Sequence, residues 1–217
     1  MKYRLAVFDM DGTILDTLED LTDSMNFTLT HFGYPTRTID EIRSFVGNGL
    51  AKLMERACPP GTDAARLGEV LGVFNGHYAR HCADKTGPYP GILSLIRDLR
   101  AAGMLTAVVS NKADYGVQEL CHRYFEGLFD AAVGERPGVM RKPAPDMVRA
   151  VLARLGVDRA EAVYIGDSDV DVMTAKNSGL DLVAVAWGFR TVDFLKSAGA
   201  LRIAGDAGEL KNILLAP

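Results

Sequence analysis

Apolar residues fall into short runs that alternate with segments of helical periodicity over much of this chain. Strand-length apolar runs occupy 5–8, 105–109, 162–165 and 182–186, and weaker strands are expected over 129–133 and 201–203. Between them, helical spacing predicts helices over 93–102, 115–124, 145–155 and 170–177, with glycine stops at 156 and 179. Regular alternation of strand and helix predicts an α/β fold, a doubly wound parallel sheet (a Rossmann-like core) with helices on both faces.

Residues 17–84 break this alternation, because they contain no convincing strand and show helical spacing throughout. Four helices are expected here, the first closing at Gly33 and the second opening with the capping box Thr38–Glu41. The segment Gly87–Gly91 marks the return to strands and helices. We therefore expect two domains: an α/β core of residues 1–16 and 85–217, and an inserted α-helical domain of residues 17–84.

Composition narrows the class of protein further. The chain has 217 residues, 48% of them hydrophobic, and a net charge of only −4. Without a basic excess or a basic run, neither nucleic acid nor a membrane surface is expected as a partner. No apolar run approaches the ~20 residues of a membrane span. Three widely spaced cysteines without a CxxC pair favour a reducing, cytoplasmic location, and nothing in the sequence specifies an oligomeric state.

Polar side chains follow the expected strands, at the edge where parallel strands end. The groups are Asp9 and Asp11, then Ser110–Lys112, then Arg141–Pro143, and finally Gly166–Asp171. Ligands of open parallel sheets bind at this edge, where the strand order reverses. With the order 3-2-1-4-5, Asp9, Asp11 and Asp167 converge, provided that strand geometry persists beyond Asp9. Three oxygen donors in one crevice predict a Mg²⁺ site.

Taken in order, these motifs resemble those of one known family. DxDGT at the first strand, Ser–Asn at the second, Lys–Pro before a helix and GDxxxD at the fourth span nearly the whole chain. The set is similar to the haloacid dehalogenase superfamily, in particular to its phosphatase branch with a helical cap inserted after the first motif. The segment Arg43–Leu50, and the DTLEDL that follows the first motif, resemble those of phosphoglycolate phosphatase-like members.

The resemblance implies a catalytic role for several motif residues. Asp9 is expected to be the nucleophile that forms an aspartyl phosphate, and Asp11 the general acid and then the general base. Ser110 and the backbone of Asn111 are expected to hold phosphate oxygens. Lys142 is expected to bind the phosphate and to neutralise charge on Asp9 and on the transferring phosphoryl group.

The same resemblance implies a Mg²⁺ cofactor. Its expected ligands are Asp9, Asp167 and Asp11, the last through its backbone carbonyl, while Asp171 would bind the ion directly or orient its waters. The activity implied is Mg²⁺-dependent hydrolysis of a small phosphomonoester through an aspartyl-phosphate intermediate. A phosphoglycolate-like substrate is favoured.

The cap is expected to select the substrate. Backbone at Gly47, Asn48 and Gly49 could approach a small phosphorylated metabolite closely, because glycine leaves room for it. Arg43 and Lys52 are candidate contacts for a substrate carboxylate. Both could equally be surface charges on cap helices.

Several other functions are weighed against a phosphatase. A phosphomutase of the β-phosphoglucomutase type would also need Asp11, and a pyrophosphatase would use the same site, so both stay open. A dehalogenase would share the nucleophile Asp9 but would need neither Asp11 nor the metal cluster. A receiver-type phospho-acceptor domain also gathers acids, a hydroxyl and a lysine on a doubly wound sheet. Its acceptor follows an internal strand, however, and it carries no such helical insert.

Overall fold

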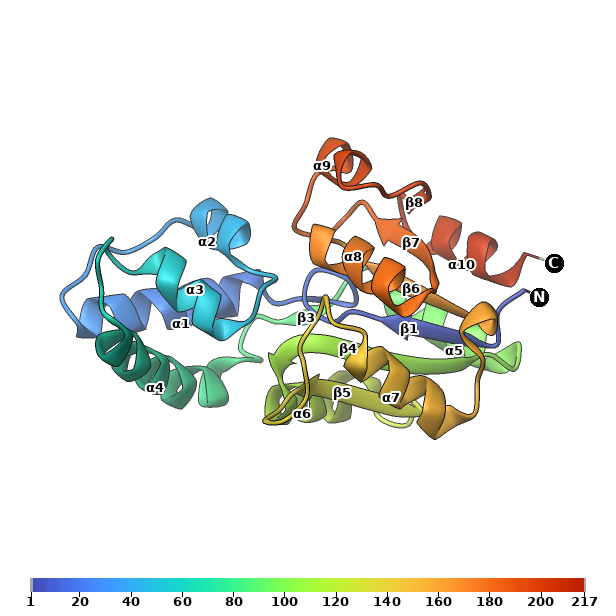
Figure 1. Ribbon diagram of the computed structural model, residues 1–217, viewed down its shortest axis with the longest axis horizontal. Coiled ribbons are helices and arrows are strands. Elements are labelled where there is room, and N and C mark those ends of the chain that lie inside the picture. The colour runs from blue at the N-terminus through green and yellow to red at the C-terminus, as the bar shows by residue number, and fades with distance from the viewer. Residues whose placement is uncertain (1, 217) are drawn as a thin grey trace. The chain divides into compact units, whose positions relative to one another are not determined.

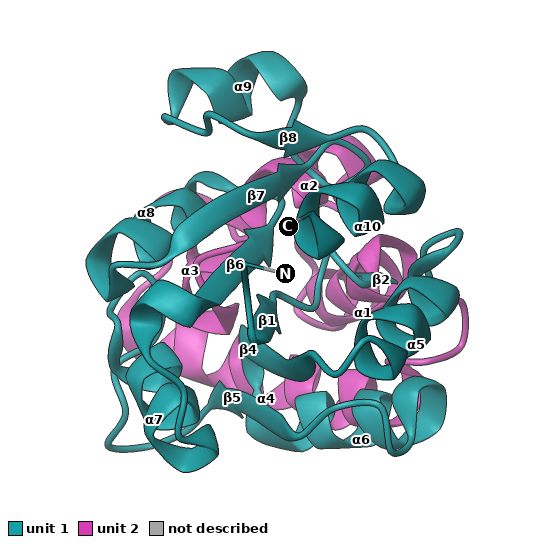
Figure 2. Cartoon of the chain, turned by 90° about the vertical axis from the view of Figure 1, so that its right-hand side faces the viewer, with its two compact units in different colours: residues 1–15, 88–217 teal, residues 16–87 magenta. Residues whose placement is uncertain are grey.

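The computed structural model describes residues 2–216 and divides into two compact units (Figure 2). The first unit comprises Met1–Leu15 and Pro88–Pro217, and the second comprises Asp16–Gly87. The chain passes between the units twice. At these passages two short strands, β2 (Leu15–Asp16) and β3 (Gly87–Pro88), pair with each other.

The first unit is built on a six-stranded parallel sheet (Figure 1). Its strands are β1 (Leu5–Phe8), β4 (Leu105–Ala113), β5 (Ala131–Glu135), β6 (Ala162–Gly166), β7 (Asp181–Val185) and β8 (Ile203–Ala204). Their order is β5-β4-β1-β6-β7-β8, and every pairing is parallel. The predicted doubly wound α/β core is therefore confirmed, with the strand order reversing at β1 as expected.

Helices cover both faces of this sheet. They are α5 (Ile92–Ala101), α6 (Asp114–Phe125), α7 (Asp146–Leu155), α8 (Asp169–Ser178), α9 (Val192–Ser197) and α10 (Ala207–Leu215), with a 3₁₀ turn at Arg159–Glu161. Helices α7 and α8 pack on one face, where Val151 and Ala175 meet apolar residues of β1, β4 and β6. Helices α5 and α10 lie on the other face (Figure 2). Gly156 and Gly179 end α7 and α8 in the left-handed conformation, as their positions in the sequence predict.

Strand β4 extends further than its apolar run predicts, through Ser110–Lys112 to Ala113. Its register against β5 shifts between Val109 and Ala113. A Cβ at Gly134 of β5 would lie 2.7 Å from the carbonyl oxygen of Lys112, so glycine is needed for this close approach. The irregular end of β4 therefore presents Ser110–Lys112 at the carboxyl edge of the sheet.

The second unit consists of four helices, as its periodicity predicts. They are α1 (Leu18–His31), α2 (Ile39–Phe45), α3 (Leu50–Ala57) and α4 (Ala64–His81). The capping box at Thr38 is present. The Thr38 hydroxyl accepts a hydrogen bond from the Glu41 backbone N–H, and the Glu41 carboxylate accepts one from the Thr38 backbone N–H. The buried carboxylate of Asp20 accepts hydrogen bonds from the backbone N–H groups of Lys85 and Thr86, which anchors the returning chain to α1. No helix in the described part of either unit combines the length and apolar composition of a membrane span.

Candidate active site

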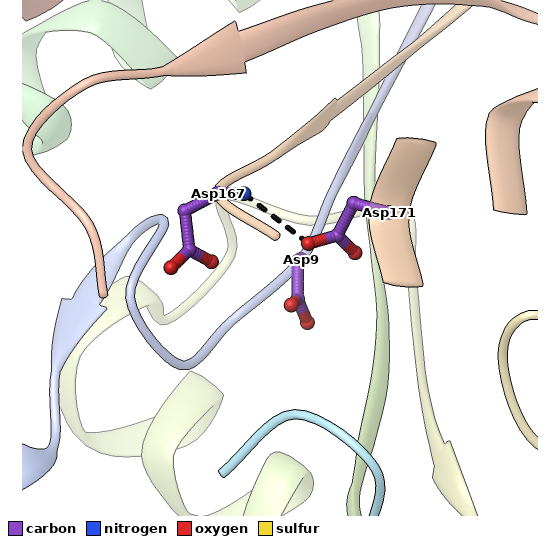
Figure 3. Close-up of side chains that lie close together, drawn as sticks. All are labelled: Asp9, Asp167 and Asp171. Carbon is purple, nitrogen blue, oxygen red and sulfur yellow. Dashed lines mark hydrogen bonds between the residues drawn. The ribbon is translucent and has the colours of Figure 1, made fainter. Parts of the chain in front are cut away.

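Three carboxylates meet at the carboxyl edge of the sheet in the first unit (Figure 3). Asp9 directly follows β1, Asp167 directly follows β6, and Asp171 lies in the first turn of α8. One carboxylate oxygen from each lies within 4.8 Å of the others. Because β1 and β6 are neighbours in the sheet, their ends bring Asp9 and Asp167 together.

The carboxylate cluster of Asp9, Asp167 and Asp171 is buried, with 1% of Asp167 and 0% of Asp171 exposed. Burial raises the pKa of Asp9 well above its usual range, and the neighbouring carboxylates add to this, although the Lys142 ammonium opposes it. Burial and the Asp171 carboxylate raise the pKa of Asp167 to about 7. The three buried carboxylates face one ammonium, that of Lys142, so negative groups outnumber positive ones in the cluster. An all-oxygen donor set with unbalanced negative charge fits a hard divalent cation such as Mg²⁺.

Lys142 is the cation that this cluster already contains. Its Nζ lies 2.8 Å from Oδ1 of Asp9 and 2.8 Å from Oδ1 of Asp171. It also donates to the Tyr164 hydroxyl at 3.0 Å. Burial alone would lower the pKa of Lys142, but the carboxylates of Asp171 and Asp9 outweigh it and raise that pKa well above its usual range. Lys142 therefore stays protonated and balances the charge of Asp9.

Neighbouring groups hold Lys142 in place. The side-chain amide of Asn111 accepts from the Lys142 backbone N–H at 2.8 Å and donates to its carbonyl at 3.0 Å. Oδ2 of Asp171 accepts from the Ser168 hydroxyl at 2.6 Å and from the backbone N–H of Asp167 at 3.2 Å, while Oδ1 accepts from Lys142. Since both carboxylate oxygens of Asp171 already accept hydrogen bonds, the geometry favours Asp171 as the residue that positions Lys142 and the β6–α8 loop.

The side chain of Asp11 lies outside the carboxylate cluster. It turns instead to Lys112, whose Nζ is 3.0 Å from Oδ1 of Asp11. The side chain of Asp11 is 21% exposed and that of Lys112 only 4%. The hydroxyl of Ser110, also buried, accepts from the backbone N–H of Lys112 at 3.2 Å. Lys112 was not among the expected site residues. Its position in the polar run Ser110–Lys112 at a strand end was nevertheless a sign that it could lie at the site.

The loop that follows β7 also reaches Asp167. The Phe189 backbone N–H donates to Oδ2 of Asp167 at 2.7 Å, and the Thr13 hydroxyl donates to Oδ1 at 3.1 Å. A Cβ on Gly188 would lie 2.5 Å from Oδ2 of Asp167 and 2.5 Å from the carbonyl oxygen of Gly12. Glycine at 188 therefore permits the packing that fixes Asp167. Sequence reasoning missed this loop, for which the only signal was a glycine just beyond an apolar run.

The two basic residues expected to contact the substrate carboxylate lie in the second unit. Arg43, on α2, pairs with Asp40 at 2.5 Å, and Lys52, on α3, pairs with Glu55 at 2.6 Å. Both pairs join residues one helical turn apart with partly exposed side chains, and such pairs contribute little to stability. Their role as substrate contacts stays a prediction.

The glycine-flanked segment 47–49 forms the loop before α3. Gly47 and Gly49 adopt φ values of 112° and 82°, which other residues rarely reach. Arg56 donates to the side-chain oxygen of Asn48 at 2.9 Å and to the carbonyl of Phe45 at 2.6 Å, so it holds this loop from α3. Arg56 was not singled out from the sequence.

Comparison with known proteins points to one family. Residues 6–185 match the haloacid dehalogenase-like hydrolase family. A phosphoglycolate phosphatase of Mesorhizobium japonicum is 35% identical over 197 residues, covering 87% of this chain and 85% of that protein. A solved structure of a candidate phosphoglycolate phosphatase from Lactobacillus delbrueckii subsp. bulgaricus has a TM-score of 0.95 and 42% identity, covering 100% of both chains. CbbY from Rhodobacter sphaeroides, solved in complex with phosphate, has a TM-score of 0.76 and 26% identity over 96% of each chain.

Proposed function

Because the chain belongs to the haloacid dehalogenase-like hydrolases, we propose that it is a Mg²⁺-dependent phosphoric monoester hydrolase that acts on a small, phosphoglycolate-like substrate. The observation that carries the proposal is the position of Lys142, which bridges Asp9 and Asp171 beside the buried carboxylate Asp167. A nucleophilic carboxylate, a fixed ammonium and a cation site within a few ångströms are the elements that phosphoryl transfer requires.

Asp9 supplies the nucleophile. One of its carboxylate oxygens forms a bond to phosphorus while the bond from phosphorus to the ester oxygen breaks, which leaves an aspartyl phosphate. Asp11 donates a proton to the departing oxygen and then accepts a proton from the water that attacks the aspartyl phosphate. This second displacement releases inorganic phosphate and restores the Asp9 carboxylate.

The remaining core residues hold the phosphoryl group and balance its charge. Lys142 neutralises Asp9 and the phosphoryl oxygens, and its rigid hydrogen bonding means that little reorganisation accompanies the reaction. Ser110 and Asn111 lie near the end of β4, and the Asn111 side chain contacts Lys142. The Ser110 hydroxyl and the Asn111 backbone contribute hydrogen-bond donors to the phosphate oxygens.

A Mg²⁺ ion would be bound by Asp9, Asp167 and the backbone carbonyl of Asp11, and when bound it would neutralise charge on the phosphoryl group. The raised pKa of Asp167 supports this assignment, because a buried carboxylate with unrelieved repulsion is poised to take a cation. Asp171 would bind the ion directly or orient its waters, and it also accepts a hydrogen bond from the loop that carries Asp167.

The names of the relatives support a phosphoglycolate-like substrate. A phosphoglycolate phosphatase aligns with most of the chain at 35% identity, and a structure of a candidate phosphoglycolate phosphatase aligns with all of it. The helical unit is proposed as the specificity domain, with Arg43, Lys52 and Gly47–Gly49 as its contacts to the metabolite. The family match does not favour a receiver-type domain. Free thiols at all three cysteines agree with the proposed cytoplasmic location.

A phosphate-release assay over a panel of phosphorylated metabolites tests the proposal. The purified full-length protein is assayed with Mg²⁺, with Ca²⁺ and after exhaustive chelation, with phosphoglycolate, pyrophosphate and hexose phosphates among the substrates. We expect Mg²⁺-dependent phosphate release that is fastest from phosphoglycolate and absent from the Asp9→Asn variant. Isomerised sugar phosphate without free phosphate would identify a mutase instead, and turnover that survives chelation would refute the metal assignment.

A further inference from the structure

We propose that Lys112 binds the anionic group of the leaving alcohol, and so makes the core itself select phosphate esters that carry a carboxylate next to the ester carbon. The inference rests on the proposed function, in which Asp11 protonates the leaving oxygen. It assigns to the first unit a substrate contact that sequence reasoning placed only in the cap.

The position of Lys112 follows from its contact with Asp11. The ammonium lies 3.0 Å from Oδ1 of Asp11. The leaving oxygen must come within hydrogen-bond distance of the same carboxyl group to receive its proton. The ammonium and the leaving oxygen are therefore separated by no more than the width of one carboxyl group and two hydrogen bonds.

A glycolate leaving group fits within this limit. Its carboxylate is attached to the carbon that carries the ester oxygen, so the two lie on adjacent carbons. When the ester oxygen faces Asp11, the carboxylate can turn toward Lys112. An ammonium carries three N–H donors and can serve the carboxylates of Asp11 and of the substrate together.

The ammonium is held in a fixed and mostly dry position. The side chain of Lys112 is 4% exposed, so little water screens its charge. Its stem lies against α6, where a Cβ on Gly116 would come within 3.3 Å of Cε of Lys112. Its backbone is held by the Ser110 hydroxyl and by the close approach of Gly134. An ordered, buried charge of this kind discriminates between anionic and neutral substrate ends more strongly than a flexible surface lysine.

A purely structural role for Lys112 makes a different prediction. If the ammonium served only to orient Asp11, its loss would slow every alkyl phosphate alike, because all of them need the proton from Asp11. If it also binds the substrate, its loss should slow esters with an anionic leaving group more than esters with a neutral one. The specificity ratio between two matched substrates separates these roles.

The experiment compares phosphoglycolate with 2-hydroxyethyl phosphate, which has the same two-carbon frame and a neutral end. In the full-length Lys112→Met variant, we expect the ratio of the two kcat/KM values to fall about 10- to 100-fold, the range for losing a hydrogen bond between charged groups. Lys112→Arg should recover part of the ratio, since it keeps the charge. Lys176→Met, which removes an exposed lysine from α8, should leave the ratio unchanged.

The outcomes distinguish this inference from the proposed function. A wild-type protein that releases phosphate from neither ester, nor from any other monoester, refutes the proposed function. Hydrolysis of both esters with a ratio that Lys112→Met leaves unchanged refutes only the role of Lys112. Gly116→Ala is a second variant that displaces Cε and keeps the charge. It should lower the same ratio to a smaller extent, and an unchanged ratio there counts against the inference even if Lys112→Met does not fold.

Discussion

Substituting Gly188 by alanine tests whether the loop after β7 positions Asp167. A Cβ at this position would lie 2.5 Å from the carbonyl oxygen of Gly12 and 2.5 Å from Oδ2 of Asp167. The Gly12 carbonyl is backbone, and Asp167 is held by Phe189 and Thr13, so neither can swing away as a flexible side chain would. Either the loop or Asp167 must move.

The size of the effect follows from these distances. Heavy atoms in contact normally lie about 3.5 Å apart, so the added carbon requires a shift of roughly 1 Å. A misplacement of about 1 Å at a catalytic centre lowers activity by about 10²-fold. Overpacking of this kind costs about 1–3 kcal/mol of unfolding free energy. At about 2–4 °C per kcal/mol for a chain of this size, the Tm should fall by about 2–12 °C.

The assay follows kcat and the Mg²⁺ concentration for half-maximal activity with phosphoglycolate, together with thermal unfolding. We expect Gly188→Ala to require a higher Mg²⁺ concentration for half-maximal activity. Its kcat should be lower than that of the wild type even at temperatures well below its Tm. Gly72→Ala is the matched control, because nothing lies within 4 Å of the Cβ it would add on α4. That control should gain about 0.5–1 kcal/mol of stability and keep its activity. Wild-type kcat and wild-type Mg²⁺ requirement in Gly188→Ala would refute the positioning argument.

Three further variants or conditions probe the same site. Asp11→Asn should lower kcat/KM by about 10²–10⁴-fold for alkyl phosphates and by less for aryl phosphates, whose leaving groups need little protonation; equal losses would contradict an acid role. The pKa of Asp167, raised by burial and Asp171 to about 7, exceeds the unfolded value of about 3.9, so the metal-free protein should lose stability as pH rises from about 4 to 7. Mg²⁺ competes with that proton, so thermal unfolding should show a larger Mg²⁺-induced rise in Tm at pH 8 than at pH 6. Tyr164→Phe removes a buried hydroxyl 3.0 Å from Nζ of Lys142 and should cost about 1–2 kcal/mol in denaturant unfolding, while kcat falls less than about tenfold because two carboxylates still hold Lys142.

Local patterns in the chain were sufficient to predict most of the core. Strands β1, β6 and β7 each contain a contiguous apolar run, and Gly156 and Gly179 end their helices in a backbone conformation that glycine favours. Both features can be recognised without knowing what packs against them. Helices α9 and α10 were not predicted. Helix α9 spans only Val192–Ser197, too short for its periodicity to stand out.

The candidate site was predictable only in part, because its side chains depend on turns. Asp9 and Asp11 were expected on one side if strand geometry persisted, but β1 ends at Phe8. Beyond it the chain turns, with Gly12 at φ 83°, so the side chain of Asp11 faces Lys112. Alternation of side chains holds only within a strand.

The pattern of residues along the chain is enough to specify a parallel α/β sheet with a helical insert, and to place carboxylates, a hydroxyl and a lysine at the ends of its strands. Those features depend on contiguous runs and on motifs a few residues long, so local spacing encodes them. Which groups are in contact depends on how the chain packs in three dimensions: Asp171 anchors Lys142, Lys112 pairs with Asp11, and Gly188 packs on Asp167. Asp171 and Lys142 are 29 residues apart in the sequence, and Lys112 and Asp11 are 101 apart. The geometry of these contacts follows from strand order, a register shift and loop packing. Such features arise from the packing of distant elements, which no local pattern records.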